Sequence, residues 1–196
     1  MRTGTETDAM AGKNDVRLET QRLILRRPEV GDFEAWVDLM GDERSSRFIG
    51  GPMSRPEAWR SLGLMTGHWD LRGYGNFACI LKTTGACIGR VGPWYPEGWP
   101  GQEVGWALRI SFQGQGYAEE AARAAMDWAF ETLDWSEVVH CIDPLNLPSI
   151  RLADRLGSSL LKRQALPAPY SHIVCGVYGQ SREAWRARKA ASQRRA

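Results

Sequence analysis

The stretch Gln113-Gly114-Gln115-Gly116-Tyr117-Ala118 decides the fold, because it joins an alternating strand to an amphipathic helix. Downstream, apolar residues recur with the three-and-four spacing of a single buried helical stripe: Ala118, Ala121, Ala122, Ala125, Met126, Ala129, Phe130 and Leu133. Upstream, segment 103–108 alternates with the period of two that is typical of a half-buried strand. A helix with one apolar stripe packs most simply on a sheet, so the stretch predicts an α/β fold.

The glycine turn also predicts a cradle for a phosphorylated ligand. The first four N–H groups of a helix lack intrahelical partners, and the helix dipole places partial positive charge there. Glycines let this backbone approach a diphosphate closely. Two common phosphate loops fit poorly, because a P-loop needs a lysine where Tyr117 stands and a dinucleotide fingerprint needs a small residue in place of Glu119. A tight strand-to-helix turn that binds nothing is the alternative.

Outward from this stretch, the residue patterns predict a mixed sheet with helices on both faces. Helices are expected at 32–40, 56–71 and 149–156, the second opened by the capping-box pair Ser54 and Glu57. Further strands are expected at 77–82, 86–91, 138–142, 160–163 and 173–178, the first two joined in a hairpin by residues 83–85.

Length and patterning predict one compact domain at residues 17–180 of the 196. Residues 1–16 are polar and small without periodicity, and we expect a disordered leader there. Residues 181–196 are rich in arginine, which predicts a basic C-terminal helix or tail. Contact of this segment with nucleic acid or the ribosome is the alternative to a solvated charged face.

Composition argues against several classes of protein. No apolar run approaches the roughly 20 residues that span a membrane, and the N-terminus lacks the apolar core of a secretory signal. The four cysteines are far apart and have no histidines in ligand register, so we expect reduced thiols in a cytoplasmic protein and no metal. A net charge of +2 argues against nucleic acid as a partner of the whole chain.

The pattern Gln-x-x-Gly-x-Ala at 113–118 resembles the acetyl-coenzyme A signature of the GCN5-related N-acetyltransferases (GNAT). Three further motifs resemble, in family order, the RimJ/RimL branch, which acetylates the N-termini of ribosomal proteins. They are a first strand from Leu18 to Arg26, the strand Glu103 to Leu108, and the segment Asn146 to Arg151 followed by Arg155-Leu156-Gly157.

The resemblance implies a central mixed, mostly antiparallel sheet whose middle strands splay apart to admit the pantetheine arm of acetyl-CoA. It implies that the backbone of Leu108, Arg109 and Ile110 pairs with this arm, and that the side chain of Asn146 touches it. It assigns the diphosphate to the loop residues Gln113, Gly114, Gln115, Gly116, Tyr117 and Ala118. Strands that separate lose ladder hydrogen bonds, each leaving a buried polar group that costs about 1–3 kcal/mol unless a ligand meets it.

Amine acylation needs a neutral amine, so a base that takes the proton of the ammonium helps the reaction. Glu103 is the candidate base, because the resemblance implies a carboxylate at this edge of the slot. Burial would raise its pKa into a useful range, whereas an exposed strand glutamate is the alternative. Many relatives carry a tyrosine that protonates the departing thiolate, and alignment puts Ala153 there. Ser149 could supply a hydrogen bond instead, or it could cap the helix that Pro148 and Ser149 begin.

The acceptor pocket is marked by aromatic residues and prolines near Glu103: Pro93, Trp94, Tyr95, Pro96, Trp99, Pro100 and Trp106. They predict either a stiff wall for a peptide or aromatic amine, or part of the core. His68, His140 and His172 lack a clear partner in the sequence. We expect His140 to be structural and regard His172 as an outside candidate for acceptor contact.

These observations together predict an acetyl-CoA-dependent N-acetyltransferase that acts by direct transfer in a ternary complex, on a protein N-terminus or a small-molecule amine. A catalytically silent acyl-CoA-binding sensor is one alternative, favoured by the missing tyrosine. An enzyme that detoxifies antibiotics or small amines is another, and an acidic cleft would support it. The acceptor, acyl groups other than acetyl, and pairing into a homodimer are left open by the sequence.

Overall fold

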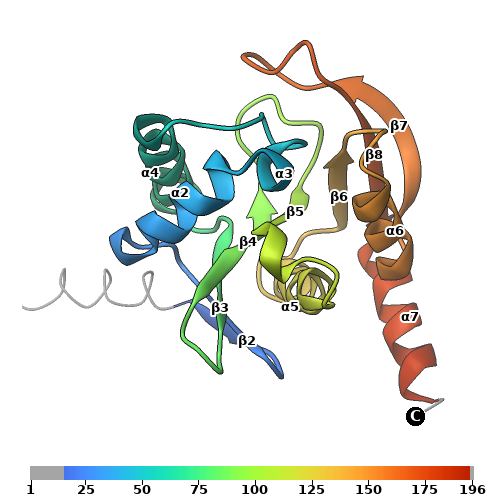
Figure 1. Ribbon diagram of the computed structural model, residues 1–196. Helices are drawn as coiled ribbons and strands as arrows, with labels where there is room; N and C mark the ends of the chain where they lie inside the picture. Colours follow the sequence, from blue (N-terminus) through green and yellow to red (C-terminus); the bar gives the residue numbers. More distant parts are fainter. Residues whose placement is uncertain (1–15, 195–196) are drawn as a thin grey trace, which may run out of the picture.

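The computed structural model describes residues 16–194, which form one 8-stranded sheet in the order β1-β2-β3-β4-β5-β6-β8-β7 (Figure 1). The strands are β1 (Arg17–Glu19), β2 (Leu23–Arg26), β3 (Phe77–Leu81), β4 (Cys87–Trp94), β5 (Glu103–Leu108), β6 (Glu137–Ile142), β7 (Ser159–Ala165) and β8 (Val174–Ser181). The helices are α2 (Phe33–Gly41), α3 (Glu43–Ser46), α4 (Arg55–Arg72), α5 (Tyr117–Glu131), α6 (Leu147–Leu156) and α7 (Arg182–Gln193), with short 3-10 turns at Val30–Asp32 and Ile110–Phe112. The predicted leader falls almost wholly on residues 1–15, which lie outside the described residues.

The expected mixed, mostly antiparallel sheet is confirmed, and one predicted strand is wrong. Residues 18–26 form two short antiparallel strands, β1 and β2, rather than one. The break has a local cause, because the Thr20 hydroxyl accepts a hydrogen bond from the Leu23 N–H at 2.9 Å and closes a turn. The basic segment after β8 forms the helix α7 through Gln193.

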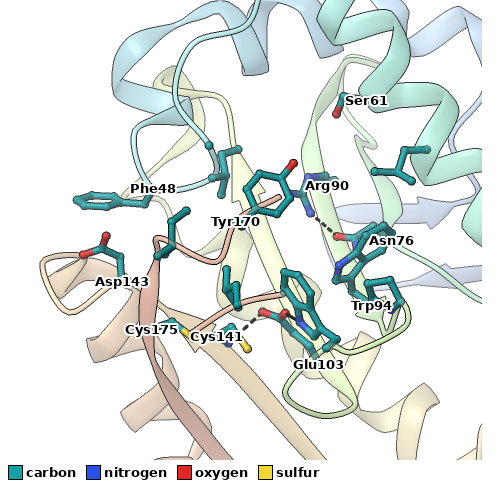
Figure 2. Close-up of a pocket in the computed structure, with 18 of the residues that line it drawn as sticks. Phe48, Ser61, Asn76, Arg90, Trp94, Glu103, Cys141, Asp143, Tyr170 and Cys175 are labelled. Carbon is teal, nitrogen blue, oxygen red and sulfur yellow. Dashed lines mark hydrogen bonds between the residues drawn. The ribbon is translucent and has the colours of Figure 1, made fainter. Parts of the chain in front are cut away.

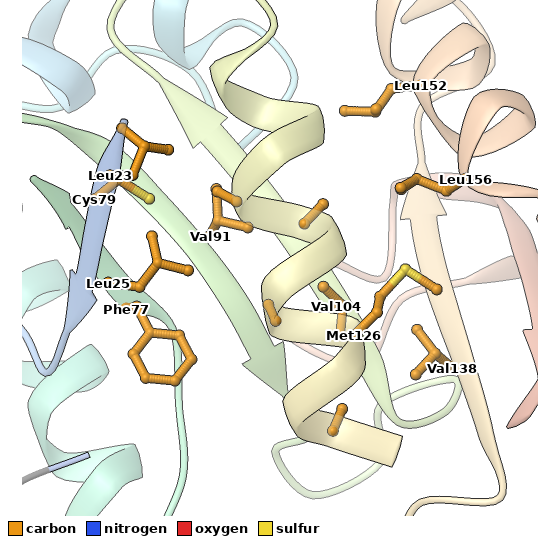
Figure 3. Packing of buried hydrophobic residues seen from close by; sticks show 14 of the residues in the cluster. Leu23, Leu25, Phe77, Cys79, Val91, Val104, Met126, Val138, Leu152 and Leu156 are labelled. Carbon is orange, nitrogen blue, oxygen red and sulfur yellow. The ribbon is translucent and has the colours of Figure 1, made fainter. Parts of the chain in front are cut away.

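Helices cover both faces of the sheet, as the sequence predicts. On one face, α2 and α4 pack through a cluster that includes Trp36, Leu62 and the β5 residue Ala107. On the other, α5 lies across the strands, with Leu23, Leu25 and Phe77 on one flank and Val138, Leu152 and Leu156 on the other (Figure 3). Four alanines of the α5 stripe, Ala121, Ala122, Ala125 and Ala129, are fully buried, so their small side chains let the helix lie close to the sheet.

The strands β5 and β6 meet in the middle of the sheet and then separate. They are parallel and share one register pair, Glu103 with Val139. The Val139 N–H donates to the Gln102 carbonyl at 2.9 Å, and the ladder does not continue beyond this pair. The β5 edge beyond Val104 therefore opens into a gap between two halves of the sheet.

The start of α5 is tied to the first strands by one carboxylate. Glu120 accepts hydrogen bonds from the Thr20 hydroxyl at 2.5 Å, the Arg22 N–H at 2.7 Å and the Arg22 Nε at 2.6 Å. Burial alone would raise the pKa of Glu120, but these hydrogen bonds outweigh burial and lower the pKa overall. None of the helices within residues 16–194 combines the length and the apolar character that crossing a membrane requires.

We expect Glu120→Gln to lower the free energy of unfolding by about 1–3 kcal/mol at pH 7, because a charged acceptor of three hydrogen bonds is lost. A lowered folded-state pKa stabilises the fold above the ordinary value of 4.5, and this contribution disappears as the pH falls below it. Urea unfolding at pH 7 and pH 3.5 should therefore show the difference between wild type and variant shrinking at low pH. Exposed Glu43→Gln is the control, and an unchanged difference at the two pH values would contradict the assignment.

Candidate active site

Two side chains form hydrogen bonds with backbone groups that lose their partners where β5 and β6 separate. If the parallel ladder continued, the Cys141 N–H would donate to the Val104 carbonyl. Instead, the Cys141 N–H donates to Glu103 Oε1 at 3.0 Å, and the Val104 carbonyl accepts from His140 Nδ1 at 2.7 Å. Glu103 and His140 thus replace one missing ladder bond with two side-chain bonds, so both groups of that bond have partners while the gap stays open.

Glu103 is a buried carboxylate, 7% exposed, so the alternative of an exposed strand glutamate is wrong. Its second oxygen accepts from the Trp99 indole Nε1 at 2.5 Å. Burial raises the pKa of Glu103, and the hydrogen bonds from Cys141 and Trp99 and the charge of Arg90 oppose this rise without cancelling it. A carboxylate with a raised pKa beside a cavity can accept a proton near neutral pH.

His140 is fully buried and structural, as predicted, but it does not lack partners. Nδ1 donates to Val104, so Nε2 accepts from the Ser158 hydroxyl at 3.0 Å, and Ser158 in turn accepts from Gln180 Nε2 at 2.9 Å. Burial lowers the pKa of His140 to about 4, so the ring is neutral at pH 7. His68 also has partners, since Nδ1 bonds the Tyr74 carbonyl at 2.9 Å and Nε2 accepts from the Tyr95 N–H at 3.3 Å.

Ser149 and Asn146 lie on the α6 side of the gap. Asn146 is the N-cap residue of α6, and its side chain accepts from the Ser149 N–H at 3.2 Å. The capping role suggested for Ser149 is therefore wrong, because the helix begins at Leu147. The Ser149 hydroxyl instead accepts from the Trp106 indole at 3.1 Å, and Ala153 is fully buried.

One cavity of about 630 Å³ is lined by Glu103, Ser149 and Asn146. Figure 2 shows Glu103 in this cavity together with Trp94, Arg90 and Tyr170. Trp94, Trp99 and Trp106 contribute to its lining, so three of the predicted wall aromatics are there, and Tyr95 is not. The loop between β7 and β8 supplies residues 166–170 and Ile173, whereas His172 is exposed and outside the lining. Three further lining residues that carry chemistry had no recognisable signal in the sequence: Asn76, Arg90 and Tyr170.

The glycine loop has the backbone that its composition predicts. Gly114 and Gly116 adopt φ values of 74° and 83°, in the left-handed region that favours glycine, and Gly116 is the N-cap of α5. The Gln115 side chain donates to the Ser111 carbonyl at 2.8 Å and stiffens the turn. The N–H groups that open α5 therefore face outward without a capping side chain.

Arg22 lies against this loop, and the sequence did not predict this contact. Its Nη1 donates to the Gln115 carbonyl at 3.0 Å, and its guanidinium carbon lies 4.3 Å from the centroid of the Tyr117 ring. The loop lacks the lysine of a P-loop, and Arg22 places a cation beside it. No local pattern could have shown this, because Arg22 and Gln115 are 93 residues apart.

The backbone groups of Leu108, Arg109 and Ile110 do not all face the gap. The carbonyls of Gln102 and Val104 accept hydrogen bonds from β6. Because the N–H and C=O groups of every second residue of a strand face the same neighbour, the backbone groups of Leu108 also face β6. The Leu108 carbonyl accepts from Gln113 Nε2 at 2.8 Å, which leaves its N–H for the gap.

The other two amides of this segment have partners within the protein. The Arg109 N–H donates to the Ile88 carbonyl, and the Ile110 N–H donates to Ser45 Oγ, both at 2.9 Å. Contact of the Arg109 and Ile110 N–H groups with a pantetheine arm stays a prediction. It would require each N–H group to leave its present acceptor in the protein and to bond the arm instead.

These features fit a coenzyme with an extended amide arm and a diphosphate. The open β5 edge at Trp106 and Leu108 offers backbone groups to amides, and the outward-facing start of α5 with Arg22 offers donors and charge to phosphates. Within residues 16–194 no cluster of three or more His, Cys, Asp or Glu side chains is arranged to hold a metal ion.

A mixed sheet split between parallel strands, with a glycine-turned helix beside the split, defines an acetyltransferase fold. Residues 22–159 match the family model of the acetyltransferase (GNAT) domain, so the chain belongs to this family of acyltransferases. The membership of the GNAT family that the sequence motifs predict is thereby confirmed, and the RimJ/RimL branch stays a prediction.

Individual relatives agree with the family. An acetyltransferase of known structure from Agrobacterium tumefaciens strain C58 is 35% identical, covers 85% of this chain and 95% of its own, and superposes with a TM-score of 0.75. An uncharacterized N-acetyltransferase of Bacillus subtilis strain 168, YnaD, is 26% identical over 151 residues, which are 72% of this chain and 82% of YnaD. The ribosomal L7/L12 alpha-N-protein acetyltransferase RimL shares the fold, with a TM-score of 0.70, 19% identity, and coverage of 85% of this chain and 94% of its own.

We expect the acid sensitivity of the fold to depend on His140. Its folded-state pKa of about 4 lies below the ordinary 6.5, so its contribution to stability is present above pH 6.5 and lost as the pH falls toward 4. Asparagine keeps a donor near the Nδ1 position and cannot take up a proton. Between pH 7 and pH 4.5, wild type should therefore lose about 2–3 kcal/mol more unfolding free energy than His140→Asn.

The measurement is urea unfolding followed by tryptophan fluorescence at several pH values. The matched control is His172→Asn, in an exposed loop, which should lose stability as wild type does. Parallel pH curves for wild type and His140→Asn would contradict the role assigned to His140.

Proposed function

We propose that this acyltransferase moves an acetyl group from acetyl-CoA to a primary amine, by direct transfer with both substrates bound. The observation that carries the proposal is the single cavity in which Glu103 and Ser149 meet beside the gap between β5 and β6. Acetyl-CoA supplies an activated thioester, so the protein needs only to accept a proton from the amine and to stabilise the departing thiolate.

Three parts of the chain would hold the coenzyme. The Leu108 N–H and the open β5 edge would meet the pantetheine arm, with Asn146 across the gap. The loop from Gln113 to Ala118 and the start of α5 would meet the diphosphate, next to the Arg22 guanidinium, which is ion-paired with Glu120. This placement leaves the face covered by α2 and α4 for the acceptor.

Glu103 is the proposed base. An α-amino group with a pKa near 8 is roughly one-tenth neutral at pH 7, so it needs little help, whereas a lysine amine near 10.4 needs far more. A buried carboxylate that both the Cys141 amide and the Trp99 indole hold in place can take the proton directly or through one water molecule.

Ser149 is the proposed partner of the leaving thiolate. Its hydroxyl already accepts a hydrogen bond from the Trp106 indole, so its own hydrogen is free to point into the cavity. A thiol of pKa about 8.5 leaves as thiolate at a penalty of roughly 2 kcal/mol at pH 7, which one hydrogen bond partly offsets. The absence of a tyrosine acid favours the alternative of a catalytically silent acyl-CoA-binding sensor. The Ser149 hydroxyl weakens this argument, because it can donate a hydrogen bond to the thiolate in place of the tyrosine.

We expect Glu103→Gln to lower kcat by about 10²- to 10⁴-fold, because a general base is lost. The KM for acetyl-CoA should change little, and the rise of kcat/KM with pH through the raised pKa of Glu103 should disappear. Thiol release at saturating acetyl-CoA measures the rate, and calorimetric titration shows whether the coenzyme still binds. Glu137→Gln, on the exposed start of β6, is the control, and unchanged turnover of Glu103→Gln at every pH would remove Glu103 from the mechanism.

We expect Gly116→Val to weaken acetyl-CoA binding by about ten-fold or more, because a side chain there strains the left-handed backbone and occupies the space beside Arg22. An ideal Cβ at Gly116 would lie 3.3 Å from Arg22 Nη2. Gly85 has a similar φ of 71° in a hairpin with open space around it, so Gly85→Val measures the strain alone. Equal affinities of both variants and wild type, measured by calorimetry, would show that the loop is only a turn.

A further inference from the structure

Arg90 places a cation in the cavity without a countercharge in contact. It lies on β4, paired with Ala107 of β5, and it faces the side covered by α2 and α4. Among residues 16–194, no carboxylate lies within ion-pair distance of it. The buried Nε has no hydrogen-bond partner there either. Arginine is always charged in proteins, so this arrangement is unfavourable unless something meets the charge.

The contact that Arg90 does make holds the guanidinium in place without neutralising it. Nη1 donates to Asn76 Oδ1 at 2.9 Å (Figure 2). Asn76 is fully buried, and its Nδ2 donates to the Pro93 carbonyl at 3.3 Å, which fixes the orientation of the amide. An aspartate would form an ion pair at this position, whereas the amide leaves the positive charge intact.

One donor nitrogen of the guanidinium is open to a ligand. Nη1 is held by Asn76, and Nε is enclosed by the protein without a hydrogen-bond partner. Nη2 is therefore the nitrogen of Arg90 left to donate to a carboxylate oxygen. Tyr170, from the loop between β7 and β8, lies beside Arg90 in the same cavity (Figure 2).

The charged residues of the lining are Glu57, Arg60, Arg90, Glu97, Glu103 and Asp143, and two of opposite charge, Arg90 and Glu103, lie on the neighbouring strands β4 and β5. Ala107 and Glu103 are four residues apart on β5, which is about 13 Å between their Cα atoms. Both side chains extend into the cavity, and the charge of Arg90 acts on Glu103, so the charged groups lie closer than the backbones. A dipeptide, whose amine and carboxylate are up to about 7 Å apart, has suitable dimensions.

We infer that the acceptor is an amine that carries a carboxylate a few bonds away, and that Arg90 binds this carboxylate through Nη2. The inference rests on the proposed function, in which the amine lies next to Glu103. The carboxylate is either the C-terminus of a short peptide or an acidic side chain at its second residue. The lining carries four carboxylates, Glu57, Glu97, Glu103 and Asp143, against the two arginines Arg60 and Arg90, so the charge of the cavity is also compatible with a cationic acceptor.

The test compares alanyl-alanine with alanyl-alaninamide, which differ only in the carboxylate. Wild type should prefer the acid by about ten-fold or more in kcat/KM for thiol release, mainly through KM. Alanyl-glutamic acid with an amidated C-terminus distinguishes the two sources of the carboxylate. Binding of each peptide to the acetyl-CoA-free protein, followed by the fluorescence of Trp94 and Trp99, gives a second readout that needs no turnover.

The variant Arg90→Gln should abolish the preference for acid over amide in both readouts. Arg90→Lys keeps the charge but loses the guanidinium that Asn76 orients, so it should retain part of the preference and serves if the glutamine variant does not fold. The matched control is Arg60→Gln, which removes an exposed arginine from the rim of the same cavity and should keep the preference.

The outcomes separate the two proposals. Equal use of acid and amide by wild type, or loss of the preference in Arg60→Gln as well, would overturn the role of Arg90 while leaving amine acetylation intact. An acid preference in binding that depends on Arg90, without thiol release from any peptide, would support the carboxylate site and count against the proposed transfer.

Discussion

The separation of β5 from β6 after a single bridge is the constraint on which the rest of the structure depends. A ladder that stops inside a buried sheet leaves donors and acceptors that cost about 1–3 kcal/mol each when unmet. Here the Cys141 N–H is met by Glu103 and the Val104 carbonyl by His140, and the two side chains act as a wedge between the strands. The same carboxylate that keeps the gap open is therefore the one placed to accept a proton. Burial of Glu103 serves both roles, because it brings the carboxylate to the Cys141 N–H and raises its pKa.

The alternation of β5 divides the proposed chemistry between two faces of the sheet. Glu103 points toward α2 and α4, whereas Trp106 points toward α5 and α6, where its indole meets Ser149. Because one cavity touches both Glu103 and Ser149, it passes through the gap rather than ending at the sheet. The proton acceptor and the proposed donor to the thiolate can therefore approach one reacting centre from opposite sides. An unsplit sheet would keep them apart.

Local patterns in the sequence predicted the elements well and the side-chain network poorly. The alternation at 103–108 gave the bounds of β5, and the apolar stripe placed the start of α5 within one residue, since both are periodic and local. The turn at Thr20 was missed because a family motif was read as one strand. The partners of His140 and Glu103 were out of reach, because these contacts join residues 36 and 38 apart in the chain. Arg90 gave no signal at all, since an arginine within an alternating strand is ordinarily a solvent-facing residue.

Two charged side chains of the cavity lining, Glu103 and Arg90, are each held by neutral partners. Glu103 is fixed by an amide N–H and an indole, and Arg90 by the amide oxygen of Asn76, so neither has to turn toward the other. Had they formed an ion pair, each would have lost its charge as a recognition element, and the paired side chains would have filled part of the cavity. Held apart, they favour a ligand with the opposite arrangement of charges, an ammonium near Glu103 and a carboxylate near Arg90. Proton transfer from this ammonium to Glu103 would leave a neutral amine still anchored by its carboxylate, which is the form that attacks a thioester.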